Sequence, residues 1–193
     1  MAEDEEQKID WIYLPPEVEE VSLWGCLHDG ELISCRSDLL RRFVGLEFKV
    51  SHLLSDAEEG VSFTIRVEAA TSVRAIGHFR SIDKYEEPRD ISPEERTQLT
   101  KEYWTKWREE SLSWSEFESA LATDPLQITD AAFVSSDCEK TLKLGGFLNG
   151  EKFDDIYFDV FVRGRGIDAS RSDGNDFNLD AFIELGRNYW DDL

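Results

Sequence analysis

Two runs in the first half of the chain alternate between apolar and polar side chains at every second position. In residues 44–52 every second position, beginning at 44, is Val, Leu, Phe, Val or His in that order. Residues 61–69 repeat the pattern with Val, Phe, Ile, Val and Ala. Successive side chains of a β-strand point to opposite faces, so this period predicts two half-buried strands. Such strands require a sheet with one face covered by a core and one face in water.

Further strands are predicted on both sides of this pair. Asp29-Gly30 and Asn149-Gly150 separate neighbouring apolar runs, and such dipeptides favour two-residue hairpin turns. We therefore expect Val21–Leu27 and Glu31–Cys35 to pair as a hairpin. Together with a short edge segment at Trp11–Leu14, the other predicted strands cover residues 73–79, 126–134, 141–148 and 156–162.

Two regions carry helical patterns instead. Ser92 with Glu95 and Ser113 with Glu116 are capping boxes, so residues 92–123 are predicted to form two consecutive helices. Residues 179–190 are predicted to form an amphipathic C-terminal helix. Strands and helices do not alternate regularly, which argues against a parallel doubly wound sheet. The predicted fold is α+β and mainly antiparallel: a sandwich or open barrel of about eight strands, with a two-helix insertion and a C-terminal helix.

Length and composition fit a single domain over residues 1–193, with residues 1–10 frayed and no linker around the insertion. An acidic N-terminus without a basic, apolar leader and the absence of a long apolar run predict a cytoplasmic protein. The three cysteines, Cys26, Cys35 and Cys138, fit a reduced compartment, although Cys26 and Cys35 could also meet across the hairpin.

The charge balance restricts the classes of partner. The chain has 42 acidic and 21 basic residues and a net charge of −21. Such a surface repels phosphate backbones and anionic lipid headgroups, so nucleic acid and membranes are not expected partners. A basic protein is a possible partner, and plain solubility is the alternative explanation.

Two small groups of residues are candidate binding sites. His28 next to Asp29 could supply acid–base or ligand-binding chemistry, but neighbours on a strand point to opposite faces and Asp29 already suits the turn. Trp104 and Trp107 lie three residues apart on the predicted insertion and share a helical face. Large aromatic side chains of this kind anchor interfaces, or they cap an open end of the sheet as core.

A third group is a candidate cation site. Asp168, Asp173 and Asp176 lie in a polar loop predicted over residues 164–178, and carboxylate oxygens are ligands for Ca²⁺ or Mg²⁺. Their spacing does not match an EF-hand, and Asp is also common in ordinary turns. Arg163, Arg165 and Arg171 in the same region could hold an anion or neutralise these acids. No catalytic motif and no cofactor motif is present, so we predict no cofactor.

The segment from Leu27 to Ser34, followed by Ser37-Asp38 and the strand from Val44 to Leu53, resembles the opening hairpin of small acidic bacterial proteins. Some of those are immunity proteins of polymorphic toxin systems. The resemblance covers about a fifth of the chain. It implies a bacterial, cytoplasmic, non-enzymatic protein that binds and neutralises a toxin.

Two functional hypotheses follow. The first is a non-enzymatic interaction domain, of immunity or inhibitor type, whose acidic surface binds a basic protein. The second is a small-molecule or metal-binding β domain, with a hydrolase-like enzyme as one form of it. It would use His28, Asp29 or the loop over residues 168–176.

Overall fold

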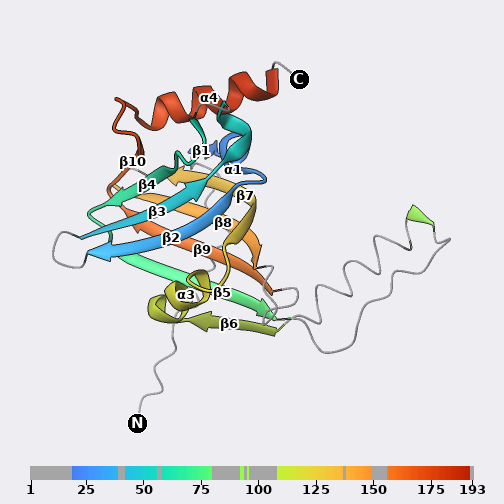
Figure 1. Cartoon of the computed structure of the whole chain (residues 1–193). Coiled ribbons are helices and arrows are strands. Elements are labelled where there is room, and N and C mark those ends of the chain that lie inside the picture. Colours follow the sequence, from blue (N-terminus) through green and yellow to red (C-terminus); the bar gives the residue numbers. More distant parts are fainter. Residues whose placement is uncertain are drawn as a thin grey trace, which may run out of the picture.

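The structure is a computed structural model that describes residues 19–38, 42–55, 58–79, 92, 93, 95, 108–136, 138–148 and 156–191. Its strands and helices follow in chain order (Figure 1) as β1 Glu19–Ser22, α1 Trp24–Leu27, β2 Glu31–Asp38, β3 Phe43–Lys49, η1 Ser51–Leu53, β4 Phe63–Glu68, β5 Ser72–Phe79, β6 Arg108–Leu112, α3 Trp114–Leu121, β7 Leu126–Ser135, β8 Lys140–Leu148, β9 Ile156–Gly164, β10 Gly166–Arg171 and α4 Leu179–Asp191.

One open sheet of ten strands contains all the described strands. Its order is β10-β4-β3-β2-β7-β8-β9-β5-β6, with β1 beside β7, and each of these pairings is antiparallel. The predicted α+β class with a mainly antiparallel sheet is therefore confirmed. Among the described residues, no helix has the length and apolar character needed to span a membrane.

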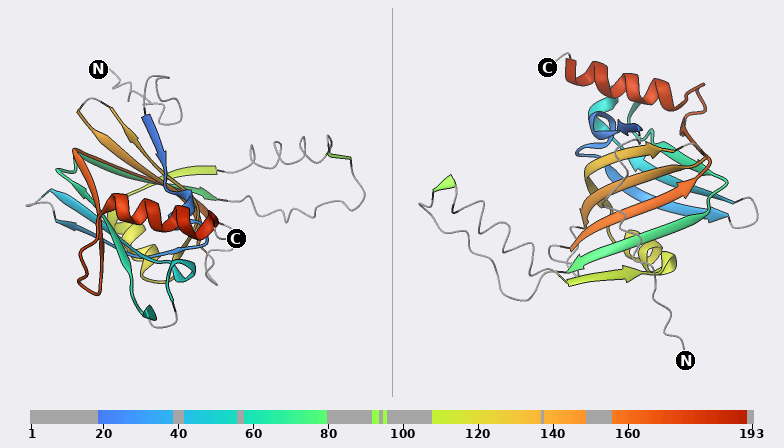
Figure 2. Two further views of the ribbon diagram at one scale, coloured as in Figure 1. Left: turned by 90° about the horizontal axis from the view of Figure 1, so that it is seen from above. Right: turned by 180° about the vertical axis from the view of Figure 1, so that it is seen from behind.

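The sheet is strongly curved because two antiparallel chain segments, β4–β5 and β9–β10, bend sharply together between their strands. β4 pairs with β10, whereas the strands that follow and precede them along the chain, β5 and β9, pair with each other. At the bend the backbone N–H of Arg165 donates to the Glu68 carbonyl, and the N–H of Thr71 donates to the Arg163 carbonyl. Strands that pass from one half of a sheet to the other in this way form the corners of a folded-over sheet. Figure 2 shows the resulting curvature.

Helices cover the two ends of this curved sheet. Figure 1 shows α4 at one end and α3 at the other. From α4, the fully buried Phe182 ring lies 5.0 Å from the ring of Phe63. From α3, the fully buried Phe117 ring lies 5.6 Å from that of Phe158. The apolar side chains of the concave face are enclosed between these two helices.

Several predicted elements are confirmed. The alternating runs form β3 and β4, with Leu46, Phe48 and Ile65 fully buried. Ser113 and Glu116 form the reciprocal capping box of α3. The amphipathic C-terminal run forms α4, where the Asn178 side chain accepts from the backbone N–H of Ala181.

The predicted hairpin between Val21–Leu27 and Glu31–Cys35 is wrong. β1 pairs with β7 instead of β2, and residues 24–27 form the short helix α1. Leu23, Cys26 and Leu27 recur at helical spacing, and all three are buried by that helical turn. The Asp29-Gly30 prediction holds in part, because Asp29 adopts the left-handed conformation with φ 61°.

β6 lies in a region predicted to be helical, and β10 lies in a region predicted to be a loop. β6 separates α3 from the capping box at Ser92, so the two predicted helices are not consecutive. Most of the first predicted helix lies outside the described residues, as does the edge segment Trp11–Leu14. β10 occupies part of the predicted polar loop 164–178, with Ile167 and Ala169 buried on its inner side.

Gly164 gives a direct test of the bend. A Cβ atom at this position would lie 2.5 Å from the Glu68 carbonyl oxygen, whereas one at Gly45 would meet nothing closer than 3.7 Å. We expect Gly164→Ala to lower the free energy of unfolding by about 1–3 kcal/mol through overpacking. Gly45→Ala should change it by less than about 1 kcal/mol. Urea unfolding of the two variants checks this, and equal losses would contradict the assigned role of the bend.

Candidate functional site

Aromatic rings from three distant segments meet at the α4 end of the sheet. Trp24 and His28 come from α1 and its C-terminal turn, His52 comes from η1, and Tyr189 and Trp190 come from α4. The Trp24 ring lies 4.4 Å from that of His28 and 5.0 Å from that of Trp190. The His52 ring lies 4.8 Å from that of Tyr189. We call these five residues the histidine–tryptophan cluster.

Close contact between α1 and α4 holds the cluster together. Gly186 of α4 lies so near α1 that a Cβ atom there would be 2.7 Å from the Cys26 sulfur. Trp190 Nε1 donates a hydrogen bond of 2.9 Å to the Gly25 carbonyl. A buried indole N–H needs such an acceptor, so this bond sets the orientation of the Trp190 ring. The short helix and the long helix are therefore fixed to each other where the rings meet.

Each of the two imidazoles of the cluster has one ring nitrogen without a hydrogen-bond partner among the described residues. These buried atoms are His28 Nδ1 and His52 Nε2. Burial lowers the pKa of His52, and the nearby Gly25 carbonyl offsets only part of that effect. His52 is therefore uncharged at neutral pH, and its free nitrogen lies in an apolar, ring-lined setting.

The predicted pair His28 and Asp29 belongs to this site. His28 Nδ1 lies 3.1 Å from Asp29 Oδ2, without the alignment of a hydrogen bond. The expectation that the two side chains point to opposite faces is wrong, because these residues form a turn and not a strand. The Asp29 side chain is 72% exposed. Trp24, 39% exposed, is the one exposed large hydrophobic residue in the described part of the chain.

Sequence reasoning missed four of the five members of the cluster as site residues: Trp24, His52, Tyr189 and Trp190. The available signal was the aromatic pair at the end of an amphipathic helix, but nothing local connects it with Trp24. The predicted binding residues Trp104 and Trp107 lie outside the described residues, and their role stays a prediction.

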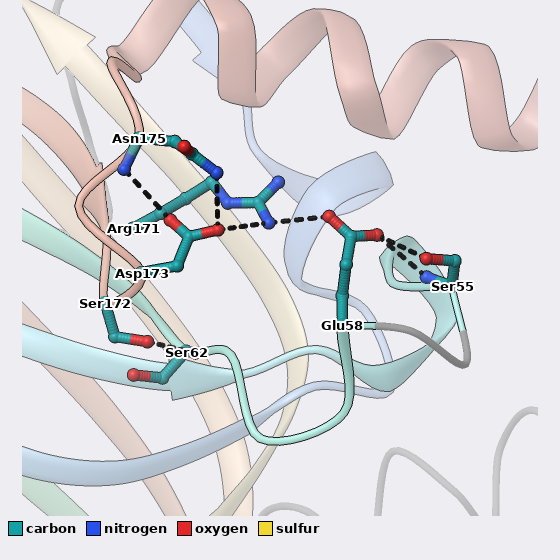
Figure 3. Close-up of polar contacts among 7 residues, drawn as sticks. All are labelled: Ser55, Glu58, Ser62, Arg171, Ser172, Asp173 and Asn175. Carbon is teal, nitrogen blue, oxygen red and sulfur yellow. Dashed lines mark hydrogen bonds and ion pairs between the residues drawn. The ribbon is translucent and has the colours of Figure 1, made fainter.

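The predicted cation loop is organised around an arginine. Arg171 Nη2 lies 2.6 Å from Glu58 Oε1 and 2.8 Å from Asp173 Oδ2, as Figure 3 shows. Its guanidinium also lies over the rings of Phe63 and Phe177, at 5.7 and 5.8 Å. Asp173 thus already balances a buried cation, and it also accepts from Asn175.

The other two predicted metal ligands do not join Asp173. Asp168 Oδ1 accepts from the Ala169 backbone N–H, and Asp176 is exposed. Across the described residues, no three His, Cys, Asp or Glu side chains gather into a group that could hold a metal ion. A metal role for Asp168, Asp173 and Asp176 stays a prediction.

A second histidine–carboxylate pair lies on the outer face of the sheet. His78 Nε2 of β5 is 2.7 Å from Asp159 Oδ2 of β9. The Tyr157 ring lies 5.8 Å from that of His78, and burial raises the pKa of this tyrosine. The sequence placed His78 in a strand but could not identify its partner, because the two residues are 81 positions apart.

The three cysteines are free thiols. Cys26 and Cys35, which could have met across the predicted hairpin, do not pair, because that hairpin does not form. The Cys26 thiol donates to the Phe182 carbonyl at 3.2 Å. Burial raises the pKa of Cys26 to about 11 and that of Cys35 to about 12.

Comparisons of the chain with protein-family models, curated proteins and solved structures found no match. What this protein does is therefore inferred from its own residues and their geometry.

Thiol accessibility gives one prediction. Iodoacetamide at about pH 8 should label the exposed Cys138 of the native protein first, because alkylation needs an accessible thiolate. Cys26 and Cys35 should react only after unfolding, when their pKa values return to the ordinary range. Peptide mass spectrometry over time distinguishes the three sites. Early labelling of Cys26 would contradict the packing of α1 against α4.

The Glu58–Arg171 pair predicts a dependence of stability on pH. The bonds to Arg171 and Ser55 lower the pKa of Glu58 to about 2 from its ordinary 4.5. The lowered pKa stabilises the native state fully above pH 4.5, and this stabilisation is lost as pH falls toward 2. The difference in free energy of unfolding between wild type and Glu58→Gln should therefore shrink across that window.

Urea unfolding at a series of pH values measures this difference. Glu59→Gln is the matched control, because Glu59 is the exposed neighbouring residue. A difference between wild type and Glu58→Gln that stays constant from neutral pH to acid would contradict the assigned ion pair.

Proposed function

We propose that this protein is a non-enzymatic interaction domain that binds a basic protein through the histidine–tryptophan cluster and Asp29. The observation that carries the proposal is the surface position of Trp24. Trp24 is an exposed large aromatic residue, and its ring packs against the ring of Trp190. It is also close in sequence to the highly exposed Asp29. Aromatic anchors of this kind contribute much of the binding energy at protein interfaces.

The chemistry of this surface favours a cationic side chain from the partner. An indole face attracts Lys or Arg through its quadrupole, and a neighbouring carboxylate adds a direct charge interaction. The net charge of −21 extends this preference over longer distances, because it attracts basic proteins during encounter. Since His52 is uncharged at neutral pH, it does not oppose a cation at this site.

The finer proposal is an inhibitor of immunity type. The segment that resembles immunity proteins includes His28 and Asp29, which lie in and beside the cluster. In this role the acidic domain would cover a basic surface of a toxin and block its activity.

The test is affinity capture of the tagged protein from its source cells at low salt, with parallel captures on Trp24→Ala and Trp24→Phe. We expect one basic protein in near-equal amount with wild type, released as salt rises. Trp24→Ala should weaken its affinity by about 10- to 100-fold, as loss of an aromatic anchor does. Trp24→Phe keeps a ring and should retain most of the binding.

Glu184→Gln is the control for charge, because it removes an exposed carboxylate of α4 away from the anchor. It should leave the affinity for the captured protein within about twofold. Equal capture by Trp24→Ala and wild type would place the interface elsewhere, and affinity indifferent to salt would count against a basic partner.

A further inference from the structure

A cavity of about 560 Å³ opens near α3, away from the histidine–tryptophan cluster. Its lining comes from the C-terminal end of β2, the start of β3, the link between β4 and β5, and the first residue of α3. The residues that define its chemistry are Ser37, Arg42, Val44, Thr71, Val73 and Trp114. Cavities of ~300–1,000 Å³ are typical of small-molecule sites.

The cavity is an unfilled end of the concave apolar face. Ser37 is paired with Val44 across β2 and β3, so both point to the inner side, where Val44 is buried. Ser37 is nevertheless exposed. Val73 is paired with the fully buried Val162 on the same inner side, yet it is only half-buried. Inner positions that remain accessible mean that α3 covers this end of the sheet without filling it.

The lining is chemically two-sided. Val44, Val73 and the Trp114 ring form an apolar wall. Arg42 is exposed and makes no ion pair with a described residue. Ser37 and Thr71 also line the cavity, and the Thr71 hydroxyl donates to Glu139 Oε1 at 3.2 Å. Three other described arginines form ion pairs: Arg66 with Glu68, Arg163 with Glu139, and Arg171 with Glu58 and Asp173.

We infer that this cavity binds a small organic monocarboxylate with an apolar chain or ring. Arg42 presents a fork of N–H donors that matches a carboxylate, while the apolar wall takes the body of the ligand. Asp38 also lines the cavity. This site is separate from the proposed protein interface, and either could exist without the other.

The test uses anilinonaphthalene sulfonate as a fluorescent anionic reporter and octanoate as the competing ligand. We expect saturable binding of the reporter by wild type and its displacement by octanoate. Val73→Trp, which fills the cavity, should abolish the displaceable fraction. Near-UV circular dichroism of this variant establishes that it has kept its native packing.

The exposed Arg42 gives a variant that leaves the core untouched. Arg42→Gln should weaken octanoate binding by about tenfold and leave displacement by neutral octan-1-ol within about twofold, because only the carboxylate uses the guanidinium. Arg36→Gln removes an exposed arginine from β2 at a position whose register partner is Gly45, on the outer face, and should change neither ligand.

Three results would overturn the inference. They are no displacement of the reporter by octanoate in wild type, full displacement in a natively packed Val73→Trp, and equal effects of Arg42→Gln and Arg36→Gln on octanoate. Any of these would show that octanoate does not bind in this cavity through Arg42.

Discussion

The whole fold depends on the sharp bend shared by the β4–β5 and β9–β10 segments. At Gly164 the two backbones come so close that no side chain fits between them. This contact turns the sheet over, because β4 continues into β5, which pairs with β9, and β9 continues into β10, which pairs with β4. The apolar sides of both halves then face one interior, where burial removes them from water and supplies the main driving force for folding.

A curved sheet that stays open has two ends, and both proposed sites lie toward these ends. α4 closes one end tightly with Phe182, and its last residues leave aromatic rings at the surface. α3 closes the other end with Phe117 but leaves a cavity beside Trp114. The residues at each end come from segments far apart in the chain, which only the fold brings together.

Several basic residues are used in ion pairs within the molecule, whereas acidic residues are in large excess. Several basic side chains are already paired within the molecule, including Lys143 with Glu20 and Arg163 with Glu139. Arg171 is the most buried of these cations and connects β10 with the loop before β4. The chain has 42 acidic and 21 basic residues, so acidic side chains outnumber basic ones by two to one. That excess attracts basic molecules and repels anions, which makes an accessible arginine in a cavity noteworthy.

Local patterns predicted those elements whose identity depends on neighbouring residues alone. Alternation identified β3 and β4, a capping box identified α3, and amphipathic spacing identified α4, because each reflects the geometry of a single segment. The sequence also singled out His28 and Asp29, two of the residues at the candidate interface. Tertiary structure alone decided that β1 pairs with β7, that β6 and β10 become strands at the two ends of the sheet order, and that Trp24 meets Trp190. These outcomes depend on contacts between residues far apart in the chain, and such contacts leave no periodic trace in the sequence.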